Sequence, residues 1–270
     1  MLVLRLFPLG LAFMAAAACA QAPQDSYQPT PGQPGKDVVW IPSPEATVEK
    51  MLDMAVVTQR DYVIDLGSGD GRNVIAAAKR GARALGVEYN PDLVALSKRA
   101  AAAAGVSDRA TFVQQDMFQA DVSRATVLIL FLIPDNLKKL VPRFLELQPG
   151  TRIVTNTYEI GGGWEPDERA ATAPCLSWCV AYLYVVPARV AGSWRLRDGE
   201  WLLLEQSYQT FSGVFELDGV QVPIAGGRLL GNEISFTVNG VAYTGRVNGD
   251  AMEGVAKGRQ TRAWRATLTP

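Results

Sequence analysis

The chain of 270 residues contains no histidine at all. This absence excludes Ser-His-Asp and Cys-His nucleophilic sites, histidine general bases and histidine zinc sites. Any proton removal therefore falls to a carboxylate, a tyrosine, a lysine or a bound water. A surplus of basic charge is also lacking, because the formal net charge is -1. The sequence thus gives no electrostatic footprint for a nucleic acid partner.

Cysteine is scarce, with only Cys19, Cys175 and Cys179 in the chain. A metal site is not expected, because without histidine the cysteines have no further soft ligands to join them. The segment "CLSWC" brings the last two cysteines close together. In an oxidising compartment such a pair predicts a small local disulfide, with two buried thiols as the alternative.

Residues 1–20 have the layout of a secretory signal peptide. Arg5 provides the cationic start, "LFPLGLAFMAAAA" is an apolar run too short for a comfortable membrane span, and small residues follow. We therefore expect export to the periplasm, with a misassigned start codon as the alternative. Ala18-Cys19-Ala20 fits a plain cleavage site, whereas "AAAC" resembles the lipid-attachment box of bacterial lipoproteins. Plain cleavage is favoured because the usual leucine three residues before the cysteine is absent, and a membrane contact is expected only if Cys19 is lipidated.

Residues 21–36 are rich in proline and glutamine, which predicts a disordered linker. Helical spacing of apolar residues begins further along, in "SPEATVEKMLDMAVV" (residues 43–57). Ser43 is predicted as the N-cap of this helix and Pro44 as its first residue.

Strands and helices then alternate over residues 37–187. The predicted strands are "DYVIDL", "ARALGVE", "ATFVQQ", "ATVLILFLI" and "RIVTNT", with helical patterns between them. The helix "PDLVALSKRAAAAA" has Asn90 as its cap and Pro91 as its first residue. Near-continuous apolar strands in such an alternation predict an α/β fold, namely a Rossmann-like, doubly wound and mostly parallel sheet with both faces covered. Sites in these folds lie at the carboxyl ends of the strands.

Residues 188–270 differ in character. Short runs alternate apolar and polar residues and break at "NG" and "GD", which are hairpin signals. We expect a small antiparallel β module there, and its strands contain no catalytic constellation.

The segment "VIDLGSGDGRN" places a glycine loop between a strand and a helix, the context in which such a loop binds a ligand. Asp65 ends the strand, and Gly67, Gly69 and Gly71 follow, with Ser68 between the first two. This G-x-G-x-G pattern is one residue shorter than the dinucleotide fingerprint, which favours a ligand without a pyrophosphate. A glycine turn that serves only packing is the alternative.

Acidic residues end the next two strands. Glu88 can accept hydrogen bonds from both hydroxyls of a ribose, and its alternative is a solvated surface glutamate. Asp116 can hold an adenine amino group while Met117 offers a backbone amide. The alternative for Asp116 is an N-cap of the following turn.

These residues together resemble the class I, seven-β-strand methyltransferases that use S-adenosyl-L-methionine, over roughly residues 37–187. The resemblance implies that Asp65 and the glycines of the loop hold the methionine end of the cofactor. It further implies that Glu88 binds the ribose and that Asp116 lies beside the adenine.

A narrower resemblance covers "VVWIPSPEATVEKML", "DLGSGDGRNVIAAAKRGARALGVEYNPDLV" and "FLIPDNL". These segments look like small mitochondrial lysine methyltransferases that modify a component of ATP synthase and the adenine nucleotide carrier. They look still more like bacterial exported proteins with a methyltransferase domain.

The fourth strand ends in "FLIPD", where amino methyltransferases of the nucleic-acid type carry Asn/Asp-Pro-Pro-Tyr. Phe131 can border a channel for methyl transfer, and Asp135 can steer a cationic amine. The alternative is that Asp135 only caps a helix that starts at Asn136. Glu159 and Trp164, in the connection after the fifth strand, are further candidates for contact with the acceptor.

The sequence therefore predicts a methyltransferase that acts on a lysine or another amine of an unidentified protein or small molecule. The alternative is a non-catalytic extracytoplasmic protein that binds S-adenosylmethionine or an adenosine-like metabolite. An enzyme that uses nicotinamide dinucleotides is disfavoured by the short glycine loop.

Overall fold

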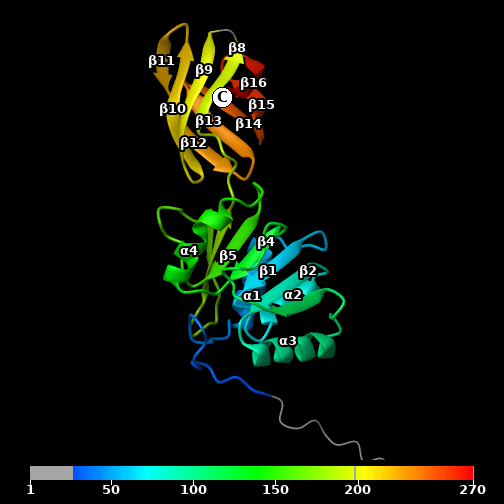
Figure 1. The fold of residues 1–270 in the computed structure, drawn as a ribbon. Helices are drawn as coiled ribbons and strands as arrows, with labels where there is room; N and C mark the ends of the chain where they lie inside the picture. Colours follow the sequence, from blue (N-terminus) through cyan, green and yellow to red (C-terminus); the bar gives the residue numbers. More distant parts are fainter. Residues whose placement is uncertain (1–26, 198, 270) are drawn as a thin grey trace, which may run out of the picture.

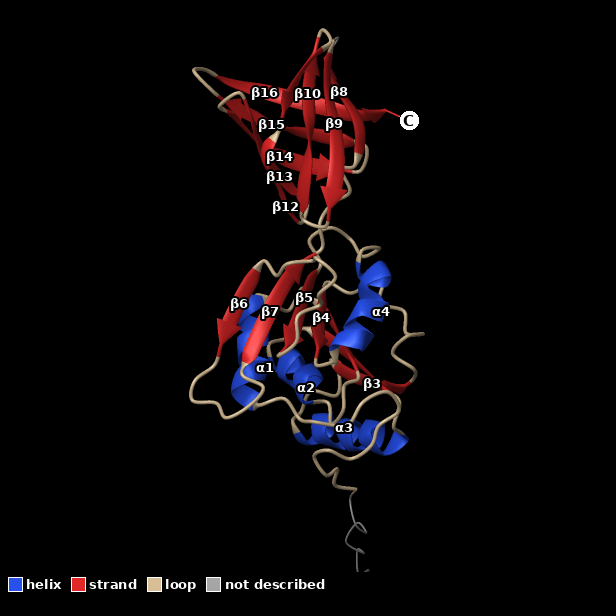
Figure 2. Cartoon of the chain, turned by 90° about the vertical axis from the view of Figure 1, so that its left-hand side faces the viewer, coloured by secondary structure: helices blue, strands red, loops and turns tan. Residues whose placement is uncertain are grey.

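The computed structural model describes residues 27–197 and 199–269. The predicted signal peptide and residues 21–26 of the predicted linker lie outside this part. The chain forms an α/β body followed by an antiparallel β barrel, and the barrel stands at the end of the α/β body that is opposite α3 (Figures 1 and 2). Within the described ranges, none of the helices has the length and apolarity needed to cross a membrane.

The α/β body is built on a seven-stranded sheet with the order β3-β2-β1-β4-β5-β7-β6. Strands β1 to β5 are parallel, whereas β7 pairs antiparallel with β5 and β6 antiparallel with β7. The bounds are β1 Tyr62–Leu66, β2 Arg83–Glu88, β3 Ala110–Gln114, β4 Val127–Leu130, β5 Arg152–Asn156, β6 Glu168–Ala171 and β7 Val180–Val185. The predicted Rossmann-like sheet is confirmed, and the antiparallel edge of β7 and β6 adds to it (Figure 2).

Four helices cover the two faces of this sheet, as expected for strands that are buried on both sides. They are α1 Glu45–Met54, α2 Arg72–Lys79, α3 Pro91–Ala103 and α4 Pro134–Phe144. The apolar sides of α1, α2 and α3 form one core cluster with the sheet, and α4 belongs to the cluster on the opposite face. All four residues of β4 are buried between these layers.

The helix starts agree with the sequence at α3 and differ at α1. The side chain of Asn90 accepts a hydrogen bond from the amide of Asp92, so the predicted cap of α3 is confirmed. At α1 the prediction is wrong by one position, because Pro44 is the N-cap and Glu45 is the first helical residue. The hydroxyl of Ser43 is instead engaged by Asn156, whose Nδ2 donates to it at 3.0 Å.

The C-terminal module is a closed barrel, which is more than the predicted set of hairpins. Its strands are β8 Gly192–Arg197, β9 Glu200–Ser207, β10 Thr210–Leu217, β11 Val220–Pro223, β12 Ala225–Leu230, β13 Glu233–Val238, β14 Val241–Asn248, β15 Ala251–Lys257 and β16 Thr261–Thr269. Pairing runs from β10 through β12 to β16, then through β8 and β9 back to β10. Aromatic rings fill the interior, and Phe236 stacks on Tyr243 with ring centroids 4.8 Å apart. Closure removes the free sheet edges that an open module would expose.

The barrel docks on the end of the sheet where the parallel strands begin. Gly231, in the turn between β12 and β13, lies against Gly150, which precedes β5, so closely that a Cβ atom would meet the Gly150 Cα at 3.0 Å. On the connection between β5 and β6, the indole of Trp164 stacks on Tyr208 of the barrel at 5.5 Å and packs edge-on against Tyr184. Trp164 is 1% exposed. It therefore joins the two bodies.

Replacing Trp164 with alanine should lower the free energy of unfolding by about 3–5 kcal/mol, because the substitution leaves a large cavity at this junction. Urea unfolding monitored by circular dichroism measures the change. Leu176→Ala is the control, since Leu176 is fully exposed and its truncation should change stability by no more than about 0.5 kcal/mol. Equal midpoints for the two variants would contradict the assignment of Trp164 to the junction.

Candidate functional site

A cavity of ≈ 360 Å³ opens at the carboxyl ends of β1 to β5. This volume is in the range of small-molecule sites, and the position is the one at which doubly wound sheets bind ligands. Its walls come from residues 33–43, from the glycine loop, from the ends of β2 and β3, and from the segments after β4 and β5. No barrel residue of the described ranges lines it.

The first two glycines of the loop face the cavity, and the third does not. Gly67 and Gly69 have φ angles of +78° and +56°, a conformation that other residues rarely adopt. A Cβ atom on Gly69 would lie 2.6 Å from Nε1 of Trp40. Gly71 is the N-cap of α2, and a Cβ atom there would meet the ring of Phe112 at 2.7 Å. Gly71 thus serves close packing between helix and sheet, while the other two glycines open the loop toward the cavity.

Asp65 lies behind the loop, at the end of β1, and is 1% exposed. Its Oδ2 accepts from Nδ2 of Asn73 at 3.0 Å, whereas its Oδ1 has no partner. Burial is the main cause that raises the pKa of this carboxyl to about 7. Oγ of Ser68 and Oδ1 of Asn73 are also buried without partners, and both residues line the cavity. Asp65 itself, predicted to hold the cofactor, is not among the lining residues. The orphaned oxygens of Ser68 and Asn73 fit a ligand that carries an ammonium group, such as the methionine end of S-adenosylmethionine.

The carboxylate of Glu88 ties the loop to the end of β2. Its Oε2 accepts from the amide of Gly69 and its Oε1 from the amide of Asn90, both at 2.9 Å. Each oxygen retains a further lone pair, and the side chain lines the cavity, so it remains able to accept from ribose hydroxyls. The predicted position of Glu88 in the site agrees with the structure.

The structure shows the cap that the sequence left open for Asp116, and the contact with adenine stays a prediction. Its Oδ1 accepts from the amide of Phe118, so it caps the turn after β3. The same carboxylate lines the cavity together with Met117. Nζ of Lys36 lies 2.6 Å from its Oδ2, and this hydrogen bond lowers the pKa of Asp116.

Residues 33–43 of the N-terminal segment line the cavity, and residues 27–32 are hydrogen-bonded to this stretch, which corrects the prediction of a disordered linker for residues 27–36. The amide of Gly32 donates to the carbonyl of Trp40 at 2.8 Å, and the amide of Trp40 donates to the carbonyl of Gln33 at 3.0 Å. Besides its pairing with Asp116, Lys36 lies over the ring of Tyr89 at 5.1 Å. Composition indicated disorder because proline and glutamine contribute little apolar burial, but these polar contacts hold the segment in place.

Three aromatic side chains line the cavity where the chain leaves β4, leaves β5 and enters β7. They are Phe131, Tyr158 and Trp178, and we call them the aromatic wall. Phe131 lies 5.5 Å from Trp178 and 6.5 Å from Tyr158 between ring centroids, and Tyr158 lies 6.4 Å from Trp178. The sequence predicted Phe131 and missed the other two. Trp178 stands between the cysteines of "CLSWC", and the predicted disulfide between Cys175 and Cys179 is confirmed. A tryptophan inside a disulfide loop was the signal available for it.

Three predicted acceptor contacts do not lie at the cavity. Asp135 is exposed in the first turn of α4, whose N-cap is Ile133, so it neither lines the cavity nor caps the helix. Glu159 is exposed and outside the lining, and Trp164 lies at the junction with the barrel. The helix begins two residues earlier than predicted because Pro134 occupies its first position, which turns Asp135 toward solvent.

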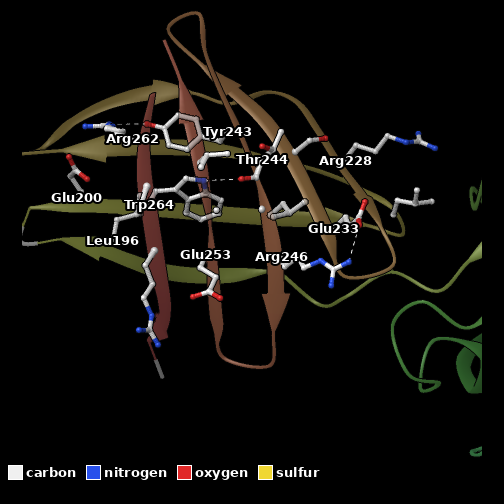
Figure 3. Close-up of a pocket in the computed structure, with 18 residues that line it drawn as sticks. Leu196, Glu200, Arg228, Glu233, Tyr243, Thr244, Arg246, Glu253, Arg262 and Trp264 are labelled. Atoms are coloured by element: carbon white, nitrogen blue, oxygen red, sulfur yellow. Dashed lines mark hydrogen bonds and ion pairs between the residues drawn. The ribbon is translucent and has the colours of Figure 1, made fainter. Parts of the chain in front are cut away.

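A second cavity, of ≈ 1180 Å³, lies on the barrel (Figure 3). Its charged lining pairs across neighbouring strands, where Arg246 lies 3.1 Å from Glu233 and stands opposite Glu253, which in turn stands opposite Arg265. Cross-strand pairs of opposite charge stabilise a sheet. In the part of the chain that the structure describes, no group of three or more His, Cys, Asp or Glu residues could hold a metal.

Comparisons with known proteins agree with this geometry. Residues 65–168 match the model of the ANTKMT methyltransferase domain. A protein-lysine N-methyltransferase of Saccharolobus islandicus is 40% identical over 152 residues, which are 55% of this chain and 94% of that protein. The adenine nucleotide translocase lysine N-methyltransferase of Mus musculus is 36% identical over 106 residues, which are 38% of this chain and 46% of that protein. The chain thus spans less than half the length of this second relative.

One solved structure also matches part of this chain. It is an RNA methyltransferase from Salinibacter ruber in complex with S-adenosyl-L-homocysteine, with 40% sequence identity and a TM-score of 0.52. The match covers 56% of this chain and 96% of that chain.

The buried Asp65 makes a testable contribution to stability. An unfolded aspartate titrates near 3.8, whereas Asp65 titrates at about 7 in the fold, so the folded state binds the proton more tightly. Its contribution is fully present below pH 3.8 and is lost as the pH rises through 7. In the absence of ligand, the free energy of unfolding of the wild type should therefore fall between pH 4 and 7. That of Asp65→Asn should fall less steeply, by up to about 1.4 kcal/mol per pH unit. Urea unfolding at four pH values measures how the free energy of unfolding of each protein depends on pH. Equal dependence in the two proteins would refute the raised pKa of Asp65.

Two glycines of the loop, the acidic strand ends Glu88 and Asp116, and the orphaned oxygens of Ser68 and Asn73 converge on one cavity at the position typical of this fold. The matching relatives share this part of the chain and are methyltransferases by name. The cofactor is S-adenosyl-L-methionine, and the chain belongs to the class I S-adenosylmethionine-dependent methyltransferases.

Proposed function

We propose that the chain is an exported methyltransferase that modifies lysine side chains of a protein. The observation that carries this proposal is the aromatic wall, which lines the same cavity as the residues suited to the cofactor. Aromatic faces attract ammonium groups and also lower the dielectric around them. The names of the relatives from Saccharolobus islandicus and Mus musculus support a lysine acceptor.

On the cofactor side, the backbone of Gly67 and Gly69 would hold the methionine end, with Glu88 at the ribose and Asp116 and Met117 at the adenine. S-adenosylmethionine supplies a methyl group that is already activated on a sulfonium. The task of the protein is therefore to hold a neutral nucleophile at attack distance. Placement of this kind can lower a barrier by about 7–11 kcal/mol.

On the acceptor side, the aromatic wall addresses the protonation of the amine. A lysine ammonium has an unperturbed pKa near 10.4 and must lose its proton before it can attack. Desolvation beside Phe131, Tyr158 and Trp178 favours the neutral amine and lowers its pKa. This chemistry needs no dedicated histidine base, in keeping with a sequence that has none.

Two other functions have less support. The Salinibacter ruber protein acts on RNA by its name, but the net charge of -1 provides this chain with no basic surface excess for a polyanion. A non-catalytic binding protein would need the cofactor residues alone and leaves the aromatic wall without a use.

Export is the second part of the proposal. It rests on the layout of residues 1–20 and on the disulfide between Cys175 and Cys179, because disulfides persist in oxidising compartments such as the periplasm. The predicted cleavage after the small residues and the lipidation of Cys19 remain the two processing routes.

The two sides of the cavity should respond differently to mutation. Glu88→Ala should weaken S-adenosylmethionine binding by about one to two orders of magnitude, because a hydrogen bond to a charged group contributes roughly 1.5–3 kcal/mol. Phe131→Ala should leave that affinity within about threefold but reduce methyl transfer, since it removes part of the acceptor side. Calorimetry measures binding, and transfer of a labelled methyl group to an envelope extract from a deletion strain measures activity.

Asp135→Ala is the matched control for this experiment and should label the extract as well as the wild type. Digestion and mass spectrometry of the labelled material should find methylated lysine. Tight cofactor binding by a wild-type protein that labels nothing would favour the non-catalytic alternative, and label confined to RNA would refute the lysine acceptor.

Export has a direct test as well. Replacing residues 1–20 with a single methionine should retain the protein in the cytosol, where Cys175 and Cys179 should be found reduced. Cell fractionation and alkylation of free thiols measure both properties. Full-length protein that is uncleaved and cytosolic in the wild type would disprove export, and palmitate label dependent on Cys19 would select the lipoprotein route.

A further inference from the structure

The loop closed by Cys175 and Cys179 carries one member of the aromatic wall, Trp178. The sulfur atoms are bonded, and the two Cα atoms lie 5.8 Å apart. Leu176 in this loop is fully exposed, whereas Trp178 is half-buried and lines the cavity. Of the five residues from Cys175 to Cys179, Trp178 is the one whose side chain contributes to the lining.

Trp178 is held in a backbone conformation that a bulky residue seldom adopts. Its φ angle is +61°, in the left-handed region, which persists only where the surroundings enforce it. Two groups outside the loop contribute. Oγ1 of Thr47, on α1, donates to the carbonyl of Trp178 at 3.0 Å, and the amide of Thr172 donates to the carbonyl of Cys179 at 2.8 Å. Both bonds hold the end of the loop near Cys179, so the disulfide is the constraint on the end near Cys175.

From this arrangement we infer that the disulfide is a positioning device for Trp178 and that Trp178 determines how well the enzyme binds its amine acceptor. The inference rests on the proposed function in one respect, namely that the amine bound beside Trp178 is the methyl acceptor. The described contacts of the loop reach the aromatic wall, α1 and Thr172, and none reaches the glycine loop, Glu88 or Asp116. Opening the disulfide should therefore weaken acceptor binding and leave cofactor binding unchanged.

The size of the effect follows from the contact that is lost. An ammonium over an aromatic face is stabilised by an amount that corresponds to about threefold to thirtyfold in affinity. Trp178→Ala should raise the KM for the acceptor by this factor with a smaller change in kcat, and Trp178→Phe should recover most of the loss. The double variant Cys175→Ala/Cys179→Ala should also raise the KM for the acceptor.

A double-mutant cycle separates positioning from simple destabilisation. If the disulfide acts through Trp178, adding Trp178→Ala to the cysteine double variant should raise KM no further than Trp178→Ala alone. Additive losses would overturn the inference, because they would mean that the disulfide supports the site by another route. Leu176→Ala, in the same loop and fully exposed, is the matched control and should leave the KM for the acceptor unchanged. Dissociation constants for S-adenosylmethionine, measured by calorimetry on every variant, should agree within about twofold.

A second readout does not depend on methyl transfer. The full chain labelled with 5-fluorotryptophan gives a fluorine resonance for Trp178, assigned by its loss in Trp178→Phe. This resonance should move when the disulfide is reduced, and tetramethylammonium should shift it in the oxidised protein more than in the reduced protein. A resonance unaffected by reduction would overturn the inference even if the enzyme methylates lysine. Failure to label any amine, with the resonance moving as expected, would refute the proposed function alone.

Discussion

The carboxylate of Glu88 is the contact on which the cofactor side of the cavity depends. The glycine loop has positive φ angles at Gly67, Gly69 and Gly71, so its backbone needs a partner that fixes one conformation. Glu88 provides it by accepting from Gly69 and Asn90, which joins the loop after β1 to the start of α3. One side chain at a strand end thereby sets the positions of two neighbouring connections. The same carboxylate remains available to a ligand.

The remaining parts of the chain are arranged around that side without entering it. The barrel docks at the opposite end of the sheet, through Trp164 and Gly231, and none of its described residues reaches the cavity. Residues 33–43 of the N-terminal segment line the cavity, where the hydrogen bond from Lys36 lowers the pKa of Asp116.

Local sequence patterns predicted the parts of this molecule that local chemistry determines. The five parallel strands, the cap at Asn90 and the strand-end positions of Asp65, Glu88 and Asp116 follow from periodicity, turn residues and the rules of doubly wound sheets. The antiparallel strands β6 and β7, the closure of the barrel and the aromatic wall depend on pairings between distant segments. Tyr158 and Trp178 meet only because β7 runs beside β5, which no local pattern reveals. Asp135 was misplaced because α4 begins at Pro134, ahead of the predicted start, and this turns the carboxylate outward.

The two sides of the cavity differ in what supports them. The cofactor side is held by backbone hydrogen bonds and by the carboxylates of Glu88 and Asp116, which do not depend on the redox state. The acceptor side contains Trp178, whose loop is closed by a covalent bond that forms and persists under oxidising conditions. A chain retained in the cytosol would thus keep a complete cofactor side but an incomplete aromatic wall. Under the export proposed above, an intact aromatic wall, and with it acceptor binding, would depend on an oxidising environment.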